Sequence, residues 1–362
     1  GDGSSTTTFT LTLTVANPNE DLTNVTFGYI LNLFDDNYTP PPTPASSFTF
    51  SYSDTDRTAS ITGFVGSETE VIIPSMVEHN GATYKVTAIA NGSYTTGAFY
   101  NSNITSIVIP DTVTRIGSYV FYICDSLTSI TIPSSVTSIG VGAFVGCYAL
   151  AEVYNYSPSI TVKLGETSSS NNGYLGQYAK VVYNASDLTE EKPATRIKDN
   201  NGVRYYDDGE NTVVALYPLS KDITTVSLDS RTTEINQRAF YICDSLTSIT
   251  IPESVTSIGT HAFYGCSSLP SITIPESVTS IGGGAFSICT SLTSITIPSS
   301  VTSINMNAFE RCYALAEVYN YSPSITVKLG ETSSSNNGYL GQYAKVVYNA
   351  DDLTGEKPET RI

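Results

Sequence analysis

The sequence predicts an α/β solenoid that is rich in strands and repeats one unit of 23 residues along the chain. A fixed period of this size is typical of repeat architectures, in which each unit packs only on its neighbours. Within the unit, apolar and polar residues first alternate, as they do in a strand. A proline then follows, at a place where its missing N–H is tolerated because the strand ends. The period is marked by Ile104, Leu127, Leu150, Ile223, Leu246, Leu269, Leu292 and Leu315.

The clearest copy of the unit is SLTSITIPESVTSIGTHAFYGC, at residues 245–266. Its first apolar residues follow the pattern LxxLxL, which predicts a short strand that ends before Pro252. The return path carries Val255, Ile258 and the pair Ala262-Phe263, a spacing that turns apolar side chains inward through a bend and about one helical turn. Each unit is therefore predicted to contain a strand, a turn and a short helical turn on the convex side.

The pieces LTSITIP, SVTSIG, AF and GC of this unit resemble the repeat of the BspA-like leucine-rich-repeat cell-surface protein family. The resemblance covers roughly residues 71–155 and 223–320. For the fold it implies a leucine-rich-repeat solenoid. For function it implies a cell-surface or secreted protein that adheres to host or matrix molecules, without one conserved ligand pocket.

The chain contains an internal duplication. Residues 147–197 and 312–362 agree at all but three of 51 positions, with an offset of 165. We therefore expect an N-terminal β-hairpin and Pro-rich linker in residues 1–46, a first repeat block in 47–197 and a second in 198–362. Each block should begin with a β-hairpin cap and end with a closing segment, here called the closure, at residues 157–197 and, by the same offset, 322–362. Whether the two blocks share one continuous sheet stays open.

Alternating runs and turn signals place the individual strands. Residues 9–15 and 25–34 predict a first hairpin, and 48–53 with 59–66 predict the cap of the first block. The turn DDGEN inside 202–216 predicts the cap of the second block. Further strands are predicted at 71–73, 107–109, 130–132, 153–155, 180–184, 226–228, 249–251, 272–274, 295–297 and 318–320.

Composition excludes several classes of partner. The formal net charge is −17, from 34 acidic and 17 basic residues, so nucleic acid and anionic membrane surfaces would be repelled. The sequence holds no apolar run of about 18 residues that would span a membrane. A lipid or wall anchor would therefore lie outside this chain. With the family resemblance, we expect an extracellular or cell-surface protein.

Cysteine and phenylalanine each occupy one position of the repeat. Equivalent residues of stacked coils lie about 4.8 Å apart, the spacing of neighbouring strands, so we expect a column of buried free thiols. A disulfide between adjacent coils is the alternative, although parallel side-chain directions do not suit its geometry. The phenylalanines should form a second core column. The two columns are Cys124, Cys147, Cys243, Cys266, Cys289 and Cys312, and Phe121, Phe144, Phe240, Phe263, Phe286 and Phe309.

Residues suited to catalysis are scarce. The chain has only two histidines, His79 and His261, and they belong to different blocks, so neither a metal cluster nor a Ser/His/Asp site has the residues it needs. Both are expected to be solvated. Adjacent acidic pairs lie in turn contexts rather than converging in a cleft. The sequence predicts a non-enzymatic protein without metal or cofactor.

The strand face between the buried residues is the first candidate binding surface. Its outward residues are Ser and Thr, which would line up in uncharged columns when the coils stack. One interpretation is a solvated face stabilised by cross-strand Ser and Thr pairs, and the other is an extended binding sheet. Glu253 and Glu276 follow the prolines in register, and form either a site for a cationic partner or a solvated acidic edge. The threonines on this face are Thr131, Thr250, Thr273 and Thr296.

The second candidate surface lies where each array ends, because glutamate and tyrosine there replace Ser, Thr and Pro of the unit. Exposed tyrosines would anchor a protein or a glycan; alternatively, the closure folds over them. The partner is predicted to be a host or matrix protein, with a glycan or a role as structural spacer as alternatives. The residues concerned are Glu152, Tyr154, Tyr156, Glu317, Tyr319 and Tyr321.

Overall fold

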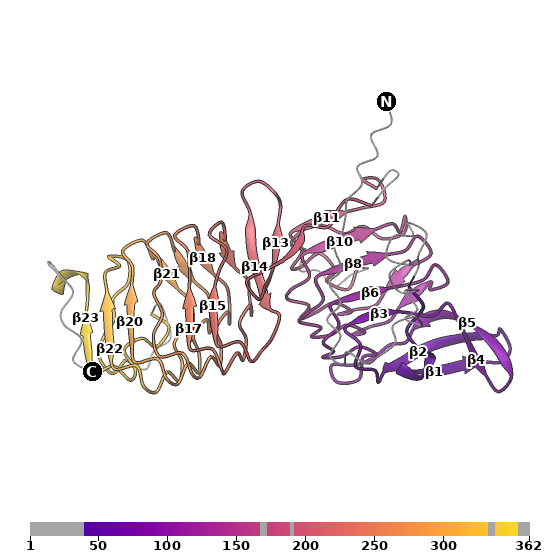
Figure 1. The fold of residues 1–362 in the computed structure, drawn as a ribbon, viewed down its shortest axis with the longest axis horizontal. Coiled ribbons are helices and arrows are strands. Elements are labelled where there is room, and N and C mark those ends of the chain that lie inside the picture. Colours follow the sequence, from indigo (N-terminus) through magenta and orange to yellow (C-terminus); the bar gives the residue numbers. More distant parts are fainter. Residues whose placement is uncertain (1–39, 167–171, 189–191, 332–336, 354–362) are drawn as a thin grey trace, which may run out of the picture. The chain divides into compact units, whose positions relative to one another are not determined.

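The computed structural model describes residues 40–166, 172–188, 192–331 and 337–353. Short strands dominate this part of the chain (Figure 1), and its only helical elements are the single 3₁₀ turns η3 (Ala45–Ser47) and η4 (Ala350–Asp352). The hairpin predicted from residues 9–15 and 25–34 lies outside the described residues.

The first block contains three sheets, with strand orders β1-β2-β5-β7-β9, β3-β6 and β8-β10-β11. The predicted hairpin cap is present as the antiparallel pair β1 and β2, and a second hairpin, β4 with β5, joins the same sheet. The pairs that link successive coils are parallel. The strands are β1 (Phe48–Ser53), β2 (Thr58–Phe64), β3 (Glu70–Ile72), β4 (Met76–His79), β5 (Ala82–Ile89), β6 (Ser106–Val108), β7 (Arg115–Ile116), β8 (Ser129–Ile132), β9 (Ser138–Ile139), β10 (Glu152–Asn155) and β11 (Val181–Tyr183).

The second block is built in the same way, with orders β12-β13-β14-β16-β18-β19-β21, β15-β17 and β20-β22-β23. Its cap is the antiparallel set β12, β13 and β14. Among the described residues no sheet contains strands of both blocks, which answers the question that the sequence left open. The strands are β12 (Ile197–Asn200), β13 (Val203–Asp207), β14 (Val213–Pro218), β15 (Thr225–Ser227), β16 (Glu234–Ile235), β17 (Ser248–Thr250), β18 (Ser257–Ile258), β19 (Ser280–Ile281), β20 (Ser294–Ile297), β21 (Ser303–Ile304), β22 (Glu317–Asn320) and β23 (Val346–Tyr348).

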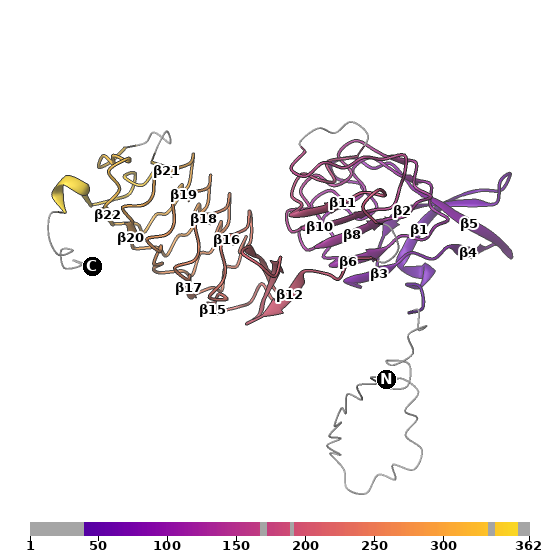
Figure 2. The same cartoon turned by 90° about the horizontal axis from the view of Figure 1, so that it is seen from above.

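Each regular coil of the second block carries a short Ser-Ile strand that the sequence reading missed. These strands pair in parallel at one constant step, Ser257 with Ser280 and Ser280 with Ser303, and Figure 2 shows β18, β19 and β21 in one row that begins with β16. A glycine follows β18 and β19, because the coils approach closely there. A Cβ on Gly282 would lie 2.5 Å from the carbonyl carbon of Gly259, so no larger residue fits.

In the described residues no coil of the repeat contains the expected helical turn, and the prediction of these turns was wrong. In their place each coil has consecutive turns in which two residues adopt positive φ, such as Arg238 (φ 57°) and Ile242 (φ 53°). A residue in this region interrupts an α-helix. The N–H groups next to such a residue bond alternately within the coil and to the next coil. Ala239 N donates to Asn236 O within the coil (3.2 Å), whereas Phe240 N donates to Ala262 O of the next coil (2.7 Å). The turns therefore bond neighbouring coils to one another.

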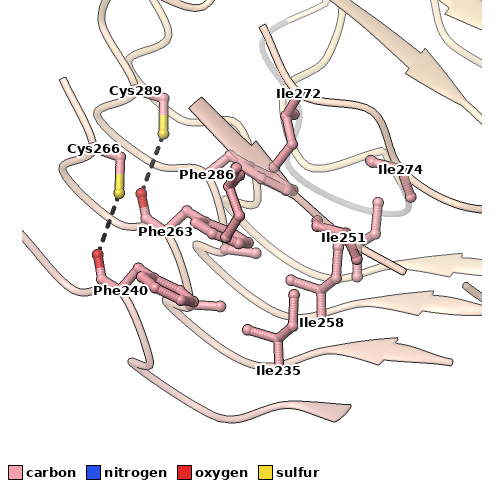
Figure 3. Close-up of a cluster of buried hydrophobic side chains, with 14 of the residues drawn as sticks. Ile235, Phe240, Ile251, Ile258, Phe263, Cys266, Ile272, Ile274, Phe286 and Cys289 are labelled. Atoms are coloured by element: carbon pink, nitrogen blue, oxygen red, sulfur yellow. Dashed lines mark hydrogen bonds between the residues drawn. The ribbon is translucent and has the colours of Figure 1, made fainter. Parts of the chain in front are cut away.

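The core consists of repeated columns of side chains. Phe240, Phe263 and Phe286 stack with ring centroids 5.3 Å apart (Figure 3). All six cysteines are buried and free. The thiol of Cys266 donates to the carbonyl oxygen of Phe240 (3.2 Å), and that of Cys289 does so to Phe263 (3.2 Å), so the two columns are joined. Burial raises the pKa of Cys312 to about 12, which keeps its thiol protonated.

Replacing Phe263 by alanine removes a middle ring of this column. The backbone bonds on both sides hold the neighbouring coils apart, so the cavity cannot collapse fully. We expect the free energy of unfolding to fall by about 3–5 kcal/mol, measured by urea denaturation. Met306→Ala is the control, because Met306 is 66% exposed. An unchanged midpoint for Phe263→Ala would contradict the position given to this ring.

The thiol column can be tested chemically. Because the thiols are buried, we expect none of the six to react with a thiol reagent in the folded protein. All six should react in denaturant without reductant. Titration of fewer than six thiols in denaturant would indicate disulfides and contradict the free column.

Candidate functional site

The outward side chains of the strand face are hydroxyls in both blocks. Thr250 and Thr273 are exposed, whereas Thr131 and Thr296 are half-buried. The isoleucines between them point into the core, and Ile130 and Ile295 are each only 1% exposed. The face therefore combines an uncharged polar surface with an apolar floor, as the alternation predicted.

The predicted strand at residues 272–274 does not form. In the coils on either side, the threonine directly before the strand donates its backbone N–H to the coil before it. Thr247 N donates to Thr224 O at 2.8 Å, and Thr293 N donates to Pro270 O at 3.1 Å. Pro270 occupies the same position and has no N–H to donate. Among the described residues no backbone hydrogen bond joins 271–274 to either neighbouring coil, so β17 and β20 belong to different sheets.

A groove with a volume of about 360 Å³ lies at this interruption. Thr273 and its neighbours form one wall and β20 the other, while Glu253 and Glu276 stand at the rim. Both glutamates are exposed, and Glu276 accepts a hydrogen bond from Ser299 Oγ at 3.2 Å. The groove is therefore lined largely by hydroxyl side chains, with negative charge at its edge.

The first block has an equivalent groove of about 230 Å³ between β6 and β8. Its wall residues lie 165 positions before those of the second groove, so the duplication has copied the feature. Here Lys192 enters the groove. Its Nζ lies 3.3 Å from Thr131 Oγ1 and 4.2 Å from the centroid of the Tyr154 ring. A cationic side chain thus fits among these hydroxyls.

The closures cover the tyrosines predicted as anchors. Tyr154 and Tyr319 are 0% and 1% exposed, so they present no binding surface and the expectation of exposed rings there was wrong. Strands β11 and β23 extend the sheets by one parallel strand each. The Tyr183 ring therefore stacks on Tyr154 and the Tyr348 ring on Tyr319, each pair with ring centroids 5.4 Å apart. Of the two alternatives, folding of the closure over the rings is the one observed.

The two glutamates beside these rings are also internal. Glu152 is 1% exposed and accepts hydrogen bonds from Thr195 Oγ1 (2.8 Å) and Arg196 N (2.5 Å). Glu317 is 3% exposed and accepts one from Tyr319 OH at 2.9 Å. Buried carboxylates with several donors hold a closure in place, so these residues are structural and not open to a partner. Tyr156 and Tyr321 remain half-buried at the edge.

Sequence reasoning missed the residues that shape this region. Pro270 could have been found, because the same position is threonine in neighbouring repeats. Asn155 and Asn320 also escaped notice. Each is fully buried and donates from Nδ2 to a backbone carbonyl five residues later at 2.7 Å. Their signal is the motif EVYN, which occurs once in the last strand of each array, just before the closure.

The described part of the chain contains no cluster of side chains for metal binding or catalysis. No group of three or more His, Cys, Asp or Glu side chains there could hold a metal ion. His79 stacks on Tyr52 with centroids 3.9 Å apart, and His261 lies in a turn with φ 54°. Neither faces the groove. The described residues also contain no helix long and apolar enough to cross a membrane.

Comparison with known proteins supports the repeat assignment. A family model described as "BspA type Leucine rich repeat region" matches six copies over residues 93–174 and 216–337, more than half of the chain. No curated protein matches.

Several solved structures are similar. A leucine-rich cell surface protein from Faecalibacterium prausnitzii is 25% identical, with 78% of this chain and 95% of that one covered and a TM-score of 0.32. A leucine-rich repeat protein from Eubacterium ventriosum is 20% identical, with 83% and 94% covered and a TM-score of 0.37. The pneumococcal vaccine antigen PcpA is 16% identical, with 78% and 87% covered and a TM-score of 0.34. At these TM-scores the similarity adds nothing to the assignment.

Pro270→Thr tests the cause of the interruption. The new N–H can donate to Thr247 O as the other coils do, so we expect a gain of about 0.5–1.5 kcal/mol in the free energy of unfolding. Thr247→Pro is the reciprocal control. It removes the 2.8 Å bond to Thr224 O and should destabilise. Urea denaturation measures both, and a loss of stability in Pro270→Thr would contradict the explanation.

Proposed function

Because the chain belongs to the BspA-type leucine-rich-repeat family, we propose that it is a non-enzymatic surface or secreted protein that binds a host or matrix protein. The binding surface is the strand face, and its centre is the groove at residues 271–276. Proteins of this architecture typically use an extended sheet of repeats to contact a partner.

The observation that carries the proposal is the interruption at residues 271–274. A strand inside a sheet has its N–H and C=O groups paired, so it can offer a partner only its side chains. In the part of the chain that the structure describes, this segment lacks backbone partners on both sides. An extended polypeptide can supply them, because main-chain hydrogen bonds give affinity in this mode of recognition.

Charge indicates which polypeptide segment fits best. Glu253 and Glu276 place two carboxylates at the rim, in a chain whose net charge is −17. A segment with lysine or arginine side chains therefore complements the groove of the second block.

A protein partner is favoured over a glycan for a structural reason. Sugar rings stack on exposed aromatic side chains, and the chain has no tryptophan. The tyrosines that would replace it, Tyr154 and Tyr319, are buried under the closures. The groove itself is lined by Ser, Thr, Ile, Pro and Glu side chains, with no aromatic ring.

The test is binding by the full chain to a panel of matrix proteins, run beside a glycan array. Thr273→Arg should reduce binding at least about tenfold, because it fills the groove and brings a positive charge where a cationic segment docks. Met306→Arg is the matched control, since it adds the same side chain at a position that is 66% exposed and outside the groove.

The outcomes separate the three functions. Loss of protein binding in Thr273→Arg and its retention in Met306→Arg support the proposal. Binding to glycans alone would favour the glycan module, and binding to neither panel would favour a structural spacer. Equal effects of the two variants would exclude the groove as the binding surface.

A further inference from the structure

The end of the first block is covered by the cap of the second. Residues 42–362 cluster as one unit. Within it, small side chains of the last coil of the first block pack against hairpin β13–β14 in a separate hydrophobic cluster. As a result, Ala149 and Ala151 are buried, with only 2% and 1% of their surfaces exposed. The cluster consists of Ala149, Ala151, Tyr206, Val214, Leu216 and Tyr217.

Polar contacts fix this docking. The Arg238 guanidinium lies 4.6 Å from the ring centroid of Tyr148 and 3.3 Å from Asp125 Oδ2. Asn236 Nδ2 donates to the Tyr148 carbonyl oxygen at 2.9 Å. Lys180 Nζ also lies 2.9 Å from a carboxylate oxygen of Glu234. The second block thus contributes an acidic, an amide and an arginine side chain to a face of the first.

The second block ends in a copy of the same face. The three differences between the duplicated segments fall at positions 351, 355 and 359, so residues 312–350 match 147–185 throughout. The local structure is also the same. Lys180 N donates to Ala151 O at 2.7 Å, and Lys345 N donates to Ala316 O at 2.7 Å. The paired tyrosine rings lie 5.0 Å apart in the first copy and 5.2 Å in the second.

The second copy is more open than the first. Tyr313, the counterpart of half-buried Tyr148, is 60% exposed. Ala314 and Ala316 are half-buried where their counterparts are buried, and Lys345 is exposed. The difference is that the first copy carries the hairpin of the next block, whereas no described element covers the second in that way.

We propose that this face of the second block is a docking surface for a further repeat block, joined end to end as the first two blocks are. The occupant begins with an apolar hairpin like β13–β14 and carries carboxylate, amide and guanidinium groups at the positions of Glu234, Asn236 and Arg238. The first copy of the face is the reason for this choice, because the same sequence there binds such a block.

One residue of the first interface is not copied. The counterpart of Asp125 is Thr290, so an arginine docking on the second face meets the tyrosine ring but no carboxylate. Docking there should be weaker than at the first face. Thr290→Asp should strengthen it.

The test uses a chain in which residues 189–353 are written twice in succession, so that Leu353 connects to Thr189 as Leu188 does. Ala316→Cys reports on the face, because the six native thiols are buried. In the original chain we expect the cysteine of Ala316→Cys to react with a thiol reagent at least about tenfold faster than that of Ala151→Cys. In the extended chain, labelling of Ala316→Cys in the first of the two copies should slow toward the rate measured for Ala151→Cys.

Each labelling result either supports or overturns the proposed docking surface. Slow labelling in the extended chain supports the proposal, and adding Thr290→Asp should slow it by about twofold to fivefold more. Unchanged fast labelling, with the native thiols of the added block still unreactive, would overturn it. Reactive thiols in the added block would also overturn it, because the identical face supports a folded block at the first closure.

Discussion

Every part of this protein depends on hydrogen bonds that a coil makes with its neighbours and cannot make by itself. In the phenylalanine turn, alternate N–H groups donate to the next coil, as Phe240 N does to Ala262 O and Phe263 N to Ala285 O, both at 2.7 Å. The Ser-Ile strands repeat this on another side of the coil. A single coil would leave these groups unpaired and its apolar face exposed.

The proposed interaction sites follow from this constraint, since they lie where the coil-to-coil bonds stop. Inside the second block Pro270 lacks the bond to the coil before it, and residues 271–274, where the groove lies, make no backbone bond to either neighbouring coil within the described ranges. The last coil of each block interrupts them again, and there a closure adds one more parallel strand. The first closure is then covered by the next cap, and the second keeps an open copy of the same face.

The repeats, their strands and the buried columns could be predicted from the sequence, because each rests on a period that apolar residues reveal. The turn at Arg238 and Ile242 could not be predicted, since neither residue favours a positive φ. Only the hydrogen bonds between coils impose this backbone conformation. The tyrosines Tyr154 and Tyr319 look exposed by register alone. Their burial depends on where the closure runs, and its Ser, Asn and Gly residues carry no apolar period that would show its path.

The most direct test of the interrupted ladder is backbone hydrogen exchange of the unmodified protein, read coil by coil across the second block. The amides of residues 271–274 should exchange much faster than those of the equivalent residues 294–297, which lie in β20 and pair with β22. Equal protection of the two segments would show that the sheet is continuous and would contradict the account of the groove.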